Sequence, residues 1–162
     1  MHSFAILQSL VLLTLANGAP VVAKKVFGAH FSFPLDGNAL FFDGQPLFGS
    51  SKTVRGIVAS ILVTTIAAPF IGLDFEIGAL VASAAMAGDL ASSFTKRRLR
   101  RPPSSRALGI DQLPESLLPL WICQDALALS VLDIAAAVGI FFASEIVFSR
   151  ILYRVHLRDQ PY

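Results

Sequence analysis

Apolar residues fill most of this chain in five long stretches that are separated by short polar segments. Each stretch has close to the roughly 20 residues that an α-helix needs to cross the hydrocarbon core of a bilayer. The stretches are 4–23, 53–73, 76–95, 113–129 and 132–154. This pattern predicts an all-α, polytopic membrane protein with about five transmembrane helices. Because no internal repeat or low-complexity linker separates the stretches, residues 1–162 are predicted to form a single domain.

The composition agrees with membrane insertion. Hydrophobic residues make up 54% of the chain and charged residues only 15%, whereas a soluble domain usually carries about 25% charged residues. The single cysteine, Cys123, excludes an intramolecular disulfide and a cysteine-cluster metal site. Polar residues are therefore scarce, and each one is informative about function.

The first stretch admits two interpretations. A secretory signal peptide would need a basic segment before its apolar run, but no positive charge precedes Lys24, so a retained helix is favoured. Asn17-Gly18-Ala19-Pro20 interrupts this helix near its end, and Pro20 is expected to kink or break it. Either a neighbouring helix closes the kink, or Asn17 faces a polar cavity.

Two longer polar segments stand out between the stretches. The first, 24–52, contains many phenylalanines, which favours a loop lying at the membrane interface, and Asp36-Gly37 and Asp43-Gly44 predict turns within it. The second, 96–111, is strongly basic, and Pro102-Pro103 excludes a helix there.

The charges predict how the chain is oriented. With five spans, all Lys and Arg residues fall on one side of the membrane and the acidic turn residues Asp74, Glu76 and Asp133 on the other. The basic positions are Lys24, Lys25, Lys52, Arg55, the run 96–106, Arg150, Arg154 and Arg158. The positive-inside rule then places the basic loops in the cytoplasm and the N-terminus outside. We therefore expect an integral protein of the cell inner or plasma membrane whose polar site faces the cytoplasm.

One helical face carries the candidate chemistry. Asp89, Ser93, Lys96 and Arg97 are spaced at i, i+4, i+7 and i+8, which aligns them on one stripe where the third apolar stretch ends. Carboxylates prefer hard divalent cations such as Mg2+, and lysine and arginine suit phosphate oxygens. The stripe is interpreted as half of a metal–triphosphate site. The competing interpretation is a carboxylate that only pairs with a cation of a neighbouring helix.

Other polar residues complete the candidate site or have plainer roles. Asp111 either returns to meet Asp89 on a shared metal or caps the following helix. Lys52 and Arg55, at i and i+3, either join the site or anchor the second helix at the interface. Anchoring to anionic headgroups suffices to explain Arg98, Arg100 and Arg101. The sequence has no Walker A motif, dinucleotide fingerprint or serine-hydrolase elbow.

Several motifs together resemble the CarS-like family (CDP-archaeol synthase), distant relatives of the bacterial CDP-diacylglycerol synthases. The resemblance runs from Asn17 to the C-terminus. It is carried by NGAP at 17–20, PLDGNALFFDGQPLFGSSKTVRG at 34–56, GDLASSFTKRR at 88–98, IDQLP at 110–114 and the closing LRDQPY. One departure is that Pro102-Pro103-Ser104-Ser105-Arg106 stands where the family usually has a proline-glycine.

The resemblance implies a membrane-embedded cytidylyltransferase. CTP and a phosphorylated glycerolipid in the bilayer would give a CDP-lipid and pyrophosphate, with Mg2+ required. The family motifs imply that Asp89 and Asp111 are metal ligands and, with Lys96, catalytic. They place the nucleotide at Asn17, Lys52, Arg55, Ser93, Lys96 and Arg97. No nucleic-acid partner is expected, and the sequence leaves open both the lipid that is used and assembly into a homo-oligomer.

Two other function classes compete with the enzyme. A non-catalytic membrane protein could bind anionic lipids through its basic loops, but that function gives no reason for Asp89 to share a face with Ser93 and Lys96. A transporter with an intramembrane carboxylate is disfavoured because five spans without a repeat are unusual for that class.

Overall fold

Helices are the regular secondary structure of the described part of the chain, and long loops connect some of them. The computed structural model describes residues 2–105 and 107–154, with side chains described up to Val147. Within these ranges the elements are α1 (Ser3–Phe27), α2 (Val54–Ala67), the 3-10 helix η1 (Ala68–Ile71), α3 (Phe75–Arg98), α4 (Gln112–Ile122) and α5 (Val131–Arg154), and there is no regular strand. The predicted all-α class is therefore confirmed. Arg106, Arg158 and the closing LRDQPY motif lie outside the described residues.

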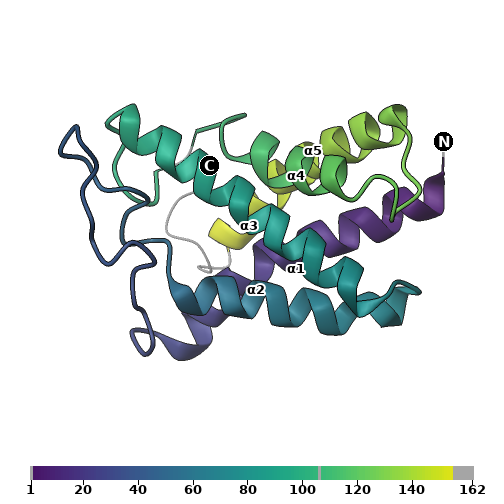
Figure 1. The fold of residues 1–162 in the computed structure, drawn as a ribbon, viewed down its shortest axis with the longest axis horizontal. Helices are drawn as coiled ribbons and strands as arrows, with labels where there is room; N and C mark the ends of the chain where they lie inside the picture. The colour runs from purple at the N-terminus through teal and green to yellow at the C-terminus, as the bar shows by residue number, and fades with distance from the viewer. Residues whose placement is uncertain (1, 106, 155–162) are drawn as a thin grey trace.

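The helices lie along the long axis of the molecule. Figure 1 shows the long α1–α2 loop and the C-terminal end of α3 at one end, and the N-terminus with the α4–α5 turn at the other. The N-terminus is joined to the start of α5 there, because the backbone N–H of His2 donates to Asp133 Oδ1 at 2.9 Å. The N-terminus and Asp133 thus share one end, as the five-span arrangement requires.

Two kinds of packing hold the helices together. Leu12, Leu13, Val81 and Leu120 are fully buried in the larger apolar cluster, which also includes residues of α5. Nearer the polar end the packed side chains are small, because Ala16, Ala82 and Ala85 form a second buried cluster there. Small residues let helix backbones approach closely without a large apolar core between them.

α1 continues through Pro20 to Phe27, so the predicted break in this helix is wrong. Proline lacks the N–H that would bond the carbonyl four residues earlier, here that of Ala16. The buried hydroxyl of Ser60 on α2 donates to that carbonyl at 2.7 Å and replaces the missing bond. The interpretation in which a neighbouring helix closes the interruption is therefore confirmed. Asn17 also lines a polar cavity, so closure by a neighbouring helix and exposure of Asn17 to a cavity are both present.

Three helical segments are long and apolar enough to cross a membrane among the described residues: α1, α2 with η1, and α3. α4 has 11 residues, which gives it a length of about 16 Å, only half of the hydrocarbon core. The expected fourth span at 113–129 is thus a short helix followed by turns. The number of five spans and the outside N-terminus stay predictions.

α3 is longer than its apolar stretch. Lys96, Arg97 and Arg98 form its last turn, and the basic loop begins only after them. Cations are favourable at this position because the C-terminal end of a helix carries partial negative charge. The extension keeps Lys96 and Arg97 in register with Asp89 on a rigid element.

Candidate active site

A polar cavity of about 700 Å³ lies at the end of the bundle that carries the long loop, a size typical of small-molecule sites. All eight residues that the sequence singled out for the site line it: Asn17, Lys52, Arg55, Asp89, Ser93, Lys96, Arg97 and Asp111. They come from α1, the start of α2, α3 and the start of α4. The fold therefore brings together side chains that are far apart in the sequence.

The α3 stripe forms one wall of this cavity. Ser93 and Arg97 are 2% exposed and Lys96 is 7% exposed, so two positive charges are nearly buried on one helical face. Gly88 precedes the stripe and lets α4 pack directly on α3, because a Cβ there would lie 2.1 Å from the carbonyl oxygen of Pro114. The close approach places Asp111, at the start of α4, opposite the stripe.

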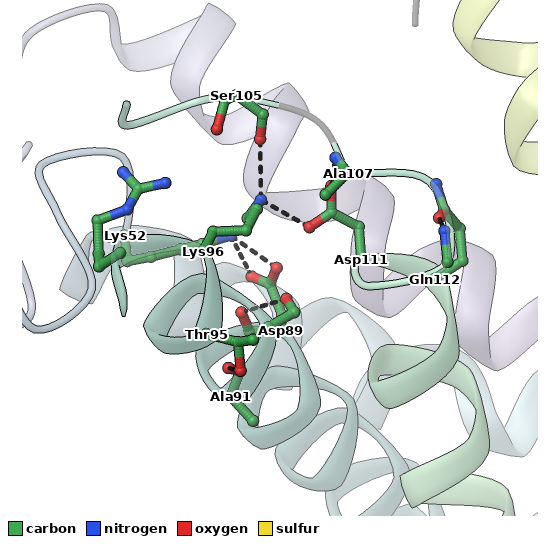
Figure 2. Close-up of polar contacts among 12 residues, drawn as sticks. Lys52, Asp89, Ala91, Thr95, Lys96, Ser105, Ala107, Asp111 and Gln112 are labelled. Carbon is green, nitrogen blue, oxygen red and sulfur yellow. Dashed lines mark hydrogen bonds and ion pairs between the residues drawn. The ribbon is translucent and has the colours of Figure 1, made fainter. Parts of the chain in front are cut away.

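Two ion pairs cross the cavity (Figure 2). Lys52 Nζ lies 2.6 Å and 2.5 Å from the two carboxylate oxygens of Asp89. Lys96 Nζ lies 2.6 Å from Asp111 Oδ1 and donates to the carbonyl of Ser105 at 2.9 Å. Each carboxylate singled out for the metal is thus paired with a lysine singled out for phosphate. The pairing expected of a purely structural Asp89 is present, but it lies within the cavity and joins two candidate site residues.

The side chain of Asp111 does not cap α4, and its predicted metal role stays a prediction. It occupies the N-cap position of α4, but its side chain makes no capping hydrogen bond to that helix. Its Oδ2 instead accepts the backbone N–H of Ala107 at 2.9 Å. The carboxylate is therefore held by the preceding loop, with its other oxygen on Lys96.

Arg97 is the least satisfied cation of the site. Its Nη2 donates to the carbonyl of Pro102 at 2.8 Å, while Nε and Nη1 are buried without a hydrogen-bond partner among the described residues. A buried guanidinium N–H without an acceptor is costly. The geometry suits an anionic ligand that would accept these bonds, and phosphate oxygens are well matched to arginine.

Arg55 has a different geometry from Arg97. Its Nη1 donates to the carbonyls of Gly28 at 3.0 Å and His30 at 2.5 Å. The residue lines the cavity, as predicted, but these bonds direct its guanidinium toward the segment that follows α1. In this structure Arg55 fixes the backbone at the cavity edge.

The loop between α1 and α2 is folded by its own turns. The predicted turns at Asp36 and Asp43 are present, and each carboxylate accepts the backbone N–H two residues later, from Asn38 and Gln45 at 3.0 Å. Asp36 Oδ2 also accepts the N–H groups of Phe48 and Gly49, both at 2.9 Å. Burial alone would raise the pKa of Asp36, but these N–H donors outweigh it and the pKa falls below its usual value. The loop thus closes on itself just before Lys52.

Arg98 corrects an interpretation made from the sequence. It does not act only as a headgroup anchor, since its Nε lies 3.1 Å from Asp43 Oδ2 and its Nη2 donates to the carbonyl of Pro46 at 2.7 Å. Its guanidinium also lies 4.6 Å and 4.7 Å from the ring centroids of Phe41 and Phe94. Arg98 therefore fastens the α1–α2 loop to the helix that carries Asp89.

Replacing Arg98 by methionine should loosen this loop while leaving the helices in place. Loss of the ion pair, the carbonyl bonds and the cation–π contacts is expected to lower kcat/KM for the nucleotide about tenfold. Cleavage within 36–49 under limited proteolysis should become faster. Arg100→Met is the matched control, because Arg100 is exposed; equal effects of the two substitutions would contradict the role given to Arg98.

Two carboxylates of the cavity were missed in the sequence. Glu115 is 7% exposed, and Glu145 on α5 lies 3.3 Å from the amide nitrogen of Gln112. Both line the cavity. A signal existed for each: Glu115 is four residues after Asp111 and so shares its helical face, and Glu145 is an ionisable residue within an apolar stretch.

The chain is similar to a defined group of known proteins. A family model described as "CarS-like: CDP-archaeol synthase" matches residues 4–162. Proteins named CDP-archaeol synthase are 30% identical in Sulfurisphaera tokodaii, over 98% of this chain and 95% of the relative, and 33% identical in Pyrobaculum islandicum, over 91% of each. The one from Pyrococcus furiosus is 36% identical over 60% of each chain. These matches confirm the family resemblance seen in the motifs.

A solved structure has the same fold. It is described as an intramembrane enzyme for archaeal membrane lipid biosynthesis, and it superposes with a TM-score of 0.69 at 25% sequence identity. The match covers 85% of this chain and 90% of that one. The likeness supports placement of the helical bundle within a membrane.

Proposed function

The chain belongs to the CarS-like family and is a CTP-dependent cytidylyltransferase of the membrane, and on that premise we propose the reaction that its cavity performs. A phosphorylated glycerolipid is the acceptor, and the products are a CDP-lipid of the CDP-archaeol or CDP-diacylglycerol type and pyrophosphate. The reaction requires Mg2+, and the active site faces the cytoplasm.

The observation that carries this proposal is the cavity itself. Where the apolar helices end, it gathers the Lys52–Asp89 and Lys96–Asp111 ion pairs and the guanidinium of Arg97. A triphosphate needs several cations at once, and Arg97 Nε and Nη1 are donors that find no acceptor among the described residues. A protein that only attracts anionic headgroups has no use for buried cations of this kind.

The donor set also fits magnesium. No group of three His, Cys, Asp or Glu residues that could hold a metal alone is found in the described part of the chain. Mg2+ is usually bound by one or two carboxylates together with substrate phosphates. Asp89 and Asp111 suit such a site, where the ion would neutralise the triphosphate and polarise its α-phosphate.

Nucleotide binding would exchange the partners of the two lysines. Lys52 leaves Asp89 and Lys96 leaves Asp111, and both ammonium groups move to phosphate oxygens. The carboxylates are then free for the cation that accompanies the nucleotide. This exchange would keep both lysines and both carboxylates paired, which avoids the cost of leaving any of these four charges unpaired in a partly buried site.

The chemical step is a direct in-line displacement. A phosphate oxygen of the lipid attacks the α-phosphorus of CTP, the bond to the β-phosphate oxygen breaks, and pyrophosphate leaves toward Lys52, Lys96 and Arg97. The residues position the two phosphates and stabilise the charge of the leaving group. No protein nucleophile is needed.

The experiment that tests this function uses the purified protein in liposomes with labelled CTP and Mg2+. A phosphorylated archaeal ether lipid and phosphatidic acid are supplied separately as acceptors. We expect a labelled CDP-lipid with at least one of them and none when EDTA is added. Absence of product with every acceptor would contradict the proposal and favour a protein that binds anionic lipid without turnover.

A further inference from the structure

The segment 27–33, Phe-Gly-Ala-His-Phe-Ser-Phe, has an apolar side that stays exposed among the described residues. Phe27, Phe31 and Phe33 are 47%, 66% and 68% exposed. The rings of Phe27 and Phe31 lie edge to face with centroids 6.4 Å apart. Three neighbouring aromatic side chains of this kind are more than a soluble surface usually shows.

The opposite side of the same segment forms part of the cavity wall. Gly28 and Ser32 line the cavity. The segment is therefore a thin partition, with small residues toward the cavity and aromatic rings away from it.

Hydrogen bonds hold this partition in one conformation. Arg55 donates to the carbonyls of Gly28 and His30, and the N–H of Val54 donates to the carbonyl of Phe33 at 3.1 Å. Phe31 has φ +57°, a left-handed conformation that is uncommon for a bulky residue and needs such support. The aromatic rings are thus presented by a fixed backbone.

The position of the segment identifies what covers the rings. It continues directly from α1, which is apolar and long enough to cross a membrane, and Lys24 and Lys25 lie in the last turn of that helix. Phenylalanine rings of interfacial segments insert at the boundary between headgroups and acyl chains, and lysines prefer the anionic headgroups beside it. Continuity with a membrane helix and this charge both favour a lipid surface.

We propose that segment 27–33 lies in the headgroup region of the bilayer and forms the wall past which the acceptor lipid brings its phosphate into the cavity. The bilayer contact is independent of the proposed function, whereas the passage of the acceptor rests on it. Arg55 is a positioning residue for this wall.

The bilayer contact is tested by fluorescence. Trp121 is the single tryptophan of the chain, so Phe31→Trp in a Trp121→Phe background reports on the segment alone, and Phe33→Trp is a second reporter if the first does not fold. In liposomes we expect blue-shifted emission that lipids brominated near the headgroup quench. Emission typical of water, quenched by aqueous iodide and not by brominated lipid, would overturn the proposal.

Passage of the acceptor is tested by kinetics in the same liposomes. Replacing Phe31 and Phe33 together by serine should raise KM for the lipid phosphate about tenfold and leave KM for CTP unchanged. Phe70→Ser is the matched control, since Phe70 is 87% exposed but lies in η1, outside the cavity lining. An equal rise in both KM values, or the same effect from Phe70→Ser, would overturn this part. If the unchanged protein forms no CDP-lipid, the proposed function fails, while the fluorescence result still decides the bilayer contact.

Discussion

Asp89→Asn is expected to abolish CTP-dependent formation of the CDP-lipid, with a loss of about 10³-fold or more. The substitution keeps the shape of the side chain but removes its negative charge. That charge pairs with Lys52 in the structure and would bind the metal once the nucleotide is present. Product formation is measured in liposomes with labelled CTP and Mg2+. The protein should still insert, because asparagine costs less in a membrane-embedded helix than an ionised carboxylate does.

A matched substitution separates this effect from a general loss of charge. Asp74→Asn removes an exposed carboxylate at the N-cap of α3, where the side chain makes no capping hydrogen bond. It should leave turnover unchanged. Normal turnover by Asp89→Asn would exclude the metal role of this residue.

Gly88→Ala should have the largest effect on the fold. The added Cβ would lie 2.1 Å from the oxygen and 2.5 Å from the carbon of the Pro114 carbonyl, so α3 and α4 must separate. Overpacking of this kind costs about 3 kcal/mol. Because Gly88 is next to Asp89 and Pro114 follows Asp111 by three residues, the two carboxylates would move apart and activity would be lost.

Thermal unfolding in detergent and turnover in liposomes measure this effect. Gly139→Ala on α5 is the control, because its Cβ would meet nothing within 4 Å and alanine favours a helix over glycine by about 1 kcal/mol. We expect a lower midpoint for Gly88→Ala and an unchanged or higher one for Gly139→Ala. Equal midpoints for both variants would contradict the described packing of α3 on α4.

Sequence reasoning succeeded where a pattern is local. The spacing of Asp89, Ser93 and Lys96 follows from the helical period alone, and the structure places them along one wall of the cavity. The turns at Asp36 and Asp43 follow equally from local chemistry, since each carboxylate bonds an N–H two residues later.

Prediction from the sequence failed where a structural feature depends on residues that are distant along the chain. The continuity of α1 at Pro20 is supported by a hydroxyl from Ser60, 40 positions later, and no periodicity predicts that contact. Arg98 looked like a headgroup anchor because Pro46, whose carbonyl it binds, is 52 residues away in the sequence. The pairing of Lys52 with Asp89 has the same origin, because the family motifs imply one site for both residues but not their mutual contact.

An experimental structure determined with CTP and with Mn2+ in place of Mg2+ would show directly whether the cavity holds a metal-bound nucleotide. We expect the ion at about 2.1 Å from carboxylate oxygens of both Asp89 and Asp111, with phosphate oxygens on Lys52, Lys96 and the Nε and Nη1 groups of Arg97. An ion or triphosphate bound elsewhere, with the Lys52–Asp89 and Lys96–Asp111 pairs still intact, would contradict this expectation.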